Sequence, residues 1–243
     1  MESVKILIAN NTQGCGKSTL SLALACHICE ESSIEPIQTT LFDCCEPFPL
    51  FNKRKEELQK GEEFMTNFAP YEIIPLSIQN DLLFKNTLNL IKNRNAAYIF
   101  DIPVNCSIPN IFQLIYHANI IVCPLIPSEK GLNETEKFVE FVSDSLRVFQ
   151  DKEERISKTE IYIVPNIINS SREENNITHF LKILLNKFNN GVNVTPIIPW
   201  RDNLFNDLST IDKIYGINEI FEPALSPIFK SLMNIYKSHY DGK

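Results

Sequence analysis

The chain has 243 residues, 44% of them hydrophobic, and a formal net charge of −7 at pH 7. This length and composition suit one globular domain and argue against a disordered chain. The charge argues against a strongly basic nucleic-acid binder, and it does not indicate non-specific DNA binding, although a local basic patch stays compatible with it. No apolar run approaches the roughly 20 residues needed to cross a bilayer, so we do not expect membrane insertion.

The first predicted elements are a strand, a turn and a helix. Residues 4–9 form the continuous apolar run of a buried parallel strand, and residues 17–32 predict a helix. Between them the chain reads Asn10-Asn11-Thr12-Gln13-Gly14-Cys15-Gly16-Lys17-Ser18-Thr19. Gly14-x-Gly16-Lys17-Ser18 in this setting predicts a phosphate-binding loop, although Asn11 stands where the strict pattern has a first Gly.

The chemistry expected of this loop follows from its backbone. Successive N–H groups and the start of the helix form a positively polarised nest for phosphate oxygens. Lys17 would reach the outer phosphates as a point charge, and the Ser18 hydroxyl would ligate Mg²⁺. We therefore predict ATP or ADP with Mg²⁺, bound by Thr12, Gln13, Gly14, Cys15, Gly16, Lys17, Ser18 and Thr19.

Strands and helices alternate along the rest of the chain. Strands are predicted at residues 36–42, 71–76, 97–102, 119–124, 160–164 and 194–198, and helices at 52–61, 80–92, 108–117, 133–149, 177–188 and 227–240. The alternation predicts an α/β fold with a mostly parallel, doubly wound sheet flanked by helices, and we expect residues 1–243 to form a single domain. Ligands of such sheets bind beyond the carboxyl ends of the strands. The loop, Asp43, Asp101, Pro124, Asn166 and Pro199 all fall there.

Two acidic residues close predicted strands. Asp101 ends the run Tyr98-Ile99-Phe100-Asp101, and Asp43 ends Thr40-Leu41-Phe42-Asp43. An apolar strand that ends in Asp is the usual partner of a phosphate loop, where the carboxylate holds a water on Mg²⁺. We predict Ser18, Asp43 and Asp101 as the metal-side residues.

Three further features have simpler interpretations. The seven cysteines, without a basic signal region after Met1, indicate reduced thiols and a cytosolic protein. Cys26 and Cys29 flank His27 but have no second pair of ligands, so we expect small core residues rather than a zinc site. Lys53-Arg54-Lys55 reads as a solvated helix face, and the helix at 227–240 as a terminal helix packed on the sheet, not a membrane anchor.

The chain resembles the ParA/MinD family of P-loop ATPases, along nearly its whole length and in order. The resemblance rests on six segments of the sequence. They are the loop, Asp43-Cys44-Cys45-Glu46-Pro47 at the family's Asp-x-Asp, Asp101-Ile102-Pro103 at its Asp-x-Pro, Ile120-Ile121-Val122-Cys123-Pro124, Tyr162-Ile163-Val164-Pro165-Asn166, and Ile197-Ile198-Pro199-Trp200-Arg201. The resemblance implies that Asn166 reads adenine and that Pro199 and Trp200 flank the base. It also implies a homodimer that forms with ATP and a partner protein, in DNA partitioning, positioning or transfer, as in ParA-like proteins of plasmids or conjugative elements.

Two positions depart from the family's pattern. The family's signature lysine, which reaches the partner's nucleotide in the dimer, falls at Thr12, and the acid that positions the attacking water falls at Cys45. Thr supplies no charge to a transition state, and Cys is a poor substitute for a carboxylate. With Lys17, Asp43 and Cys45 at the catalytic positions, we predict weak or absent hydrolysis. Glu46 would restore an acid if the alignment shifted by one residue.

Two other functions remain open from the sequence alone. One is a degenerate nucleotide-binding scaffold that recruits a partner without turnover. The other is a ligase similar to dethiobiotin synthetase, which shares the fold and also lacks the signature lysine. Asp101-Ile102-Pro103 and the stretch after Pro124 fit the ParA/MinD pattern better, and fold alone does not separate the three.

Overall fold

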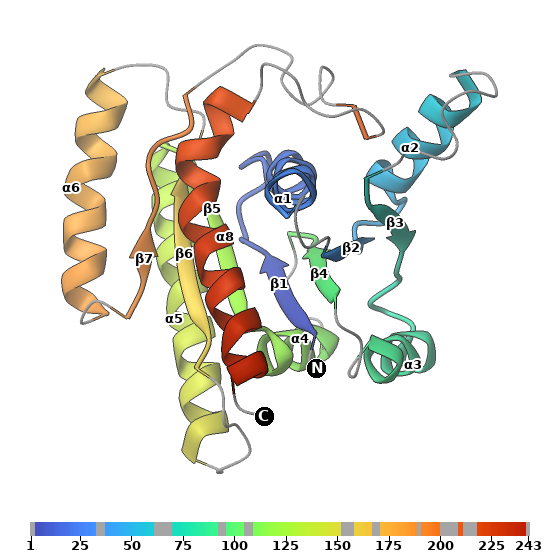
Figure 1. The fold of residues 1–243 in the computed structure, drawn as a ribbon. Coiled ribbons are helices and arrows are strands. Elements are labelled where there is room, and N and C mark those ends of the chain that lie inside the picture. Colours follow the sequence, from blue (N-terminus) through green and yellow to red (C-terminus); the bar gives the residue numbers. More distant parts are fainter. Residues whose placement is uncertain are drawn as a thin grey trace.

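A seven-stranded sheet forms the centre of the computed structural model (Figure 1). Its strands are β1 (Val4–Ile8), β2 (Gln38–Asp43), β3 (Glu72–Pro75), β4 (Ala96–Asp101), β5 (Ile120–Leu125), β6 (Glu160–Pro165) and β7 (Asn193–Val194). They lie in the order β3-β2-β4-β1-β5-β6-β7, and all pairings are parallel. The structure describes residues 3–32, 37–60, 70–91, 96–104, 109–151, 158–166, 171–188, 191–199, 209–210 and 218–241.

Helices cover both faces of this sheet. They are α1 (Lys17–Glu31), α2 (Pro49–Lys60), α3 (Asp81–Ile91), α4 (Pro109–His117), α5 (Glu129–Asp151), α6 (Ser171–Lys187) and α8 (Asn218–Asp241). One core cluster joins the sheet to α1 and α8, and a second joins the opposite face to α3, α4, α5 and α6. The predicted doubly wound α/β fold is confirmed. Within the described residues no helix is both long and apolar enough to cross a membrane.

The strand register brings the predicted functional residues together. β1 lies between β4 and β5, with Ile8 beside Asp101, and Asp43 of β2 is in register with Asp101 of β4. The loop that leaves β1 therefore starts next to two carboxylates. In parallel sheets this is the edge where ligands bind.

Helix α2 begins earlier than the sequence predicts. The prediction starts at residue 52, whereas α2 begins at Pro49, which suits a first helical position because it needs no N–H partner there. The cap comes from Asp43, whose Oδ2 accepts hydrogen bonds from the N–H groups of Leu50 at 2.8 Å and Phe51 at 3.1 Å. A cap six residues before the helix has no local sequence signature.

Arg54 corrects the interpretation of the basic cluster on α2. Its side chain is buried, with Nε 3.0 Å from Thr210 Oγ1 and Nη1 3.0 Å from the Tyr71 carbonyl oxygen. Glu57 on the same helix accepts hydrogen bonds from the Thr210 N–H at 2.7 Å and hydroxyl at 2.6 Å. The face of α2 that was expected to be solvated thus holds residues 209–210 through two charged groups.

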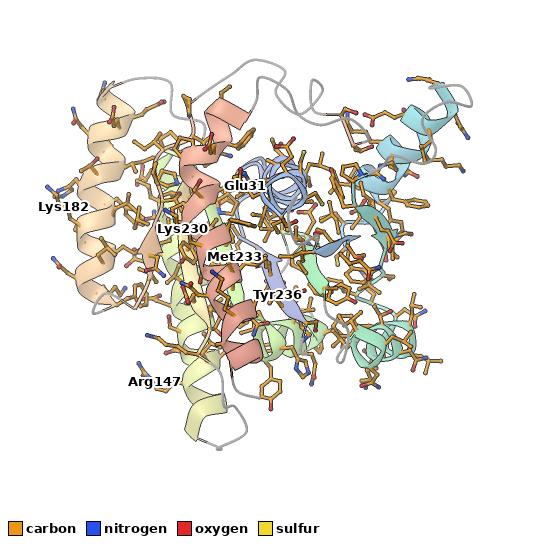
Figure 2. The ribbon with its side chains drawn as sticks, viewed as in Figure 1. Glu31, Arg147, Lys182, Lys230, Met233 and Tyr236 are labelled. Atoms are coloured by element: carbon orange, nitrogen blue, oxygen red, sulfur yellow. The ribbon has the colours of Figure 1, made fainter. Side chains whose placement is uncertain are left out.

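The C-terminal helix is longer than predicted, because α8 starts at Asn218 and includes Pro223 and Pro227. Its apolar side is buried against α1, through Phe221, Ala224, Leu225, Ile228 and Leu232. Figure 2 shows Met233 and Tyr236 on this helix, both packed against the same core, and Lys230, which is exposed. The expectation of a helix packed on the body of the protein is confirmed.

Candidate functional site

The loop after β1 takes a shape that requires its glycines. Gly14 has φ +72° and Gly16 has φ +86°, a region that other residues rarely adopt. A Cβ at Gly14 would meet nothing within 4 Å, whereas a Cβ at Gly16 would lie 2.3 Å from Asn166 Nδ2. Gly16 caps α1 without a side-chain hydrogen bond to the helix start. The first N–H groups of α1 therefore fit an anion, as the nest at the start of a helix requires.

Lys17 closes over the loop. Its side chain is 8% exposed, and Nζ donates a hydrogen bond to the Thr12 carbonyl oxygen at 3.1 Å. Cys15 beneath it is fully buried, and burial raises the pKa of its thiol. Of the other predicted loop residues, Gln13 is exposed and Thr19 is half-buried. The structure thus brings the predicted cation to the loop that would hold the phosphates.

Asn10 is a buried polar residue that holds the start of the loop in place, and local sequence patterns do not reveal it. Its Nδ2 donates to the Pro124 carbonyl oxygen and to Thr135 Oγ1, both at 2.7 Å, and its Oδ1 accepts the Thr12 N–H at 3.2 Å. Thr12, 4% exposed, also places its hydroxyl 3.4 Å from Asn10 Oδ1. Thr12 is therefore held inward, towards β5 and α5.

Asp101 lies beside the start of α1 and is fully buried. Its Oδ2 accepts a hydrogen bond from Ser18 Oγ at 2.6 Å, and its Oδ1 accepts one from Ser21 Oγ at 3.2 Å. Burial raises the pKa of Asp101 to about 6, with Ser18 opposing the shift and Asp43 adding to it. A hydroxyl on the first turn next to a carboxylate suits Mg²⁺, which takes oxygen ligands and keeps several waters. Ser18 would be the ligand, and Asp101 would hold one of those waters.

Asp43 has a structural role in this arrangement. Besides the two N–H groups of α2, its Oδ1 accepts the Cys45 N–H at 3.2 Å. It is fully buried, and burial raises its pKa while the three backbone hydrogen bonds lower it. The carboxylate therefore holds the turn between β2 and α2 in place, and its predicted metal-side role stays a prediction.

Cys45 and Glu46 are adjacent in the chain, but their side chains have different partners. Cys45 Sγ lies 3.6 Å from the Asp101 carbonyl oxygen and 3.8 Å from Asp101 Oδ2. Burial, together with Asp101 and Asp43, raises the pKa of its thiol, so the thiol form is retained. Glu46 is exposed, and its carboxylate accepts a hydrogen bond from Ser77 Oγ. Cys45, and not Glu46, is thus the residue beside Asp101.

Asn166 contacts the phosphate loop itself. It is 4% exposed, and its Nδ2 donates to the Cys15 carbonyl oxygen at 2.9 Å. The expected contact with adenine stays a prediction, and the loop contact is an additional role. Pro199 follows β7 and is exposed, while Trp200 and Arg201 lie outside the described residues.

The charge on Asp101 gives the stability a pH dependence. The folded-state pKa of about 6 lies above the ordinary value of 3.8. Asp101 therefore contributes stability that is fully present below pH 3.8 and is lost as the pH rises through about 6, by up to roughly 3 kcal/mol. Asp101→Asn should remove this fall and be the more stable protein at pH 7. Urea unfolding of both proteins between pH 4 and 7.5 measures the free energy of unfolding at each pH. The same dependence on pH in wild type and in Asp101→Asn would contradict this prediction.

Comparisons with known proteins give matches only among solved structures. No protein-family model and no curated protein matches the chain. Apo McdA from Cyanothece has a TM-score of 0.69 at 14% identity, covering 95% of this chain and 99% of that one. A putative plasmid partition protein from Borrelia burgdorferi bound to AMPPNP has a TM-score of 0.61 at 15% identity, covering 95% of this chain and 99% of that one. The cell division protein MinD from Aquifex aeolicus has a TM-score of 0.56 at 11% identity, covering 96% of each chain. The fold of this chain is that of the ParA/MinD-type P-loop ATPases.

Proposed function

We propose that this chain, with its ParA/MinD-type fold, is an ATP-binding switch that forms a homodimer with ATP and positions or partitions a cargo, with weak hydrolysis. The observation that carries the proposal is the contact of Ser18 with Asp101 at the start of α1, next to the Gly14–Gly16 loop. The glycine turn, the buried Lys17 and the Ser18–Asp101 pair all lie at the start of α1. The bound AMPPNP in the Borrelia protein supports a nucleotide as its ligand.

A change of mass with nucleotide tests the switch. We expect the purified protein to be a monomer without nucleotide or with ADP, and a dimer with ATP and Mg²⁺. Light scattering after size exclusion gives the mass under each condition. ATP turnover measured in the same samples, with and without DNA, shows whether DNA is a partner. A single mass under all conditions, together with tight ATP binding, would contradict the switch but not the nucleotide site.

A scaffold without turnover is the second candidate, and two observations favour it. Thr12 is buried and hydrogen-bonded to Asn10, and Cys45 occupies the place beside Asp101. Neither residue supplies the charge that the family's reaction uses. In this case ATP binding and dimerisation persist while turnover is absent. Product formation in a long incubation with ATP separates the two candidates.

Asn166 offers a test of where the nucleobase binds. Asn166→Ala removes the hydrogen bond to the Cys15 carbonyl and the amide that would pair with adenine. We expect ATP affinity to fall about tenfold or more, because the two lost contacts are together worth roughly 1–2 kcal/mol. The preference for ATP over GTP should shrink as well, since the amide would pair with the base. Calorimetric titrations with both nucleotides measure this, and an unchanged preference would place the base elsewhere.

A further inference from the structure

We propose that Cys45, Asp101 and Asp43 form a binding position for a thiophilic divalent cation such as Zn²⁺, which the chain holds without nucleotide. One ligand atom from each residue lies within 4.8 Å of the others. Asp43 and Asp101 are fully buried, and Cys45 is half-buried at the mouth of the group. The three residues come from the carboxyl ends of two neighbouring strands and from the turn that follows β2.

The spacing of the ligand atoms fits a tetrahedral metal. With a metal–sulfur distance of about 2.3 Å and a metal–oxygen distance of about 2.1 Å, sulfur and oxygen in a tetrahedral site lie roughly 3.6 Å apart. Cys45 Sγ and Asp101 Oδ2 lie 3.8 Å apart. Asp43 would be the third ligand and a water the fourth, while Ser18 Oγ keeps its 2.6 Å hydrogen bond to Asp101 Oδ2. The Cys45–Asp101 pair thus already has nearly the spacing of two ligands of one metal.

The charges around the group also call for a cation. Two fully buried carboxylates face each other across the register of β2 and β4. Buried charges need a partner of opposite sign. The nearby Lys17 directs its ammonium group to the Thr12 carbonyl oxygen. A divalent cation between the carboxylates would neutralise both, which the hydroxyl and backbone donors at this site do not.

The sulfur atom decides which cation is preferred. Mg²⁺ is a hard ion that takes oxygen ligands, whereas Zn²⁺ and Cd²⁺ bind thiolate strongly. As the metal–sulfur bond forms, the Cys45 thiol releases its proton to solvent, and no electron is transferred. This inference goes beyond the proposed function, because it concerns the protein without nucleotide. It assigns Cys45, a poor general base, a role that suits its chemistry.

Other thiols in the described part of the chain provide controls. Cys44 is buried in the core, with Sγ 3.7 Å from the Phe42 carbonyl oxygen, and so turns away from the acidic group. Cys29 is half-buried on α1, with Sγ 3.1 Å from the Pro70 carbonyl oxygen. Cys29→Ser therefore removes a thiol of similar exposure without touching the proposed ligands.

Titration of the nucleotide-free protein with Cd²⁺ tests the proposal. Cadmium–thiolate bonds absorb in the ultraviolet, so the absorbance counts thiolates bound per metal. We expect one equivalent of Cd²⁺ to produce the band in wild type and in Cys29→Ser. In Cys45→Ser the band at one equivalent should be lost, and the affinity should fall at least about 10–100-fold, the loss known for weaker, second-shell partners. Asp101→Asn should keep the band but weaken binding.

A second measurement guards against misfolding of a variant. Zn²⁺ should raise the melting temperature of wild type and of Cys29→Ser, but not that of Cys45→Ser, in samples whose circular dichroism matches wild type. An excess of Mg²⁺ of about 10³-fold should leave the Cd²⁺ band in place, because a thiolate ligand favours Cd²⁺ over Mg²⁺. An unchanged band in Cys45→Ser, or no band in wild type, would overturn the proposal and leave Cys45 as a hydrogen-bonded thiol. ATP binding measured on the same samples keeps this result separate from the proposed function.

Discussion

Lys17→Ala is expected to lower the affinity for ATP by about 10²-fold or more, because it removes a buried positive charge from the phosphate nest. Lys17 is 8% exposed and already lies over the loop, with its ammonium group on the Thr12 carbonyl. The phosphates would replace that carbonyl as its partner, in a site where water screens the charge little. Calorimetry with ATP and Mg²⁺ measures the loss.

Two further variants show what the lysine contributes. Lys17→Arg keeps the charge but replaces a compact ammonium by a planar guanidinium, which the closed loop would not accommodate. Lys85→Ala removes an exposed lysine of α3 that pairs with Asp81, and it should bind ATP as wild type does. Equal affinities for wild type and Lys17→Ala would show that the loop does not hold phosphates. In that outcome the switch and the scaffold proposals both fail.

Local patterns predicted much of the fold and part of the site. The apolar run of β1, the glycine turn and the start of α1 are local features, so the loop could be identified before its geometry. Asp43 and Asp101 each end a buried strand, and parallel strands end at one edge, so their proximity followed from the order of elements. The structure adds the strand register, which places Asp43 directly beside Asp101.

Contacts between distant parts of the chain could not be predicted in this way. Asn10 meets Thr135 across 125 positions, and Arg54 meets Thr210 across 156. In both cases the side chain is polar or charged, and its local sequence does not indicate a buried partner. Only the packing of β5 on β1, and of α2 on residues 209–210, gives these groups buried partners. The same holds for Asp43, whose hydrogen bonds to α2 determine where that helix begins.

The choice between Cys45 and Glu46 is the clearest case of this limit. They are adjacent, and the sequence allowed either to supply an acid near the phosphates. The turn held by Asp43 directs Cys45 to Asp101 and Glu46 to Ser77. Phe48 in the same turn has φ +64°, which is uncommon for a bulky residue. A turn built this way fixes which side chain faces the site, and sequence spacing does not reveal it.

The double variant Thr12→Lys with Cys45→Asp is expected to raise ATP turnover above that of wild type and of either single variant. A positioned base or water-orienting group is commonly worth about 10²–10⁴-fold. A cation on the transferred phosphoryl group is worth about 10³–10⁵-fold. Both act on one transition state, so the two gains do not simply multiply. A lysine without the acid, or the acid without the lysine, should therefore give only part of the increase.

The surroundings of each residue indicate what the substitutions cost. Thr12 contributes a weak side-chain contact of 3.4 Å to Asn10, while its backbone N–H bond and the other Asn10 bonds do not depend on its side chain. The longer lysine side chain would have to leave this buried position to bring its ammonium group to the phosphates. Cys45→Asp adds a third carboxylate beside Asp43 and Asp101, so the variant should need Mg²⁺ for stability at pH 7 as well as for turnover.

Matched controls separate charge from shape in this experiment. Thr12→Met with Cys45→Asn introduces side chains of similar length without charge, and its turnover should not exceed that of wild type. Glu46→Gln should change nothing, because Glu46 is exposed and bonded to Ser77. Phosphate release under saturating ATP measures turnover in wild type and in each variant. Robust turnover in wild type that is abolished by Glu46→Gln and unaffected by Cys45→Ala would mean that the β2–α2 turn rearranges when ATP binds. Glu46 would then supply the acid, and the protein would be an ordinary hydrolysing switch.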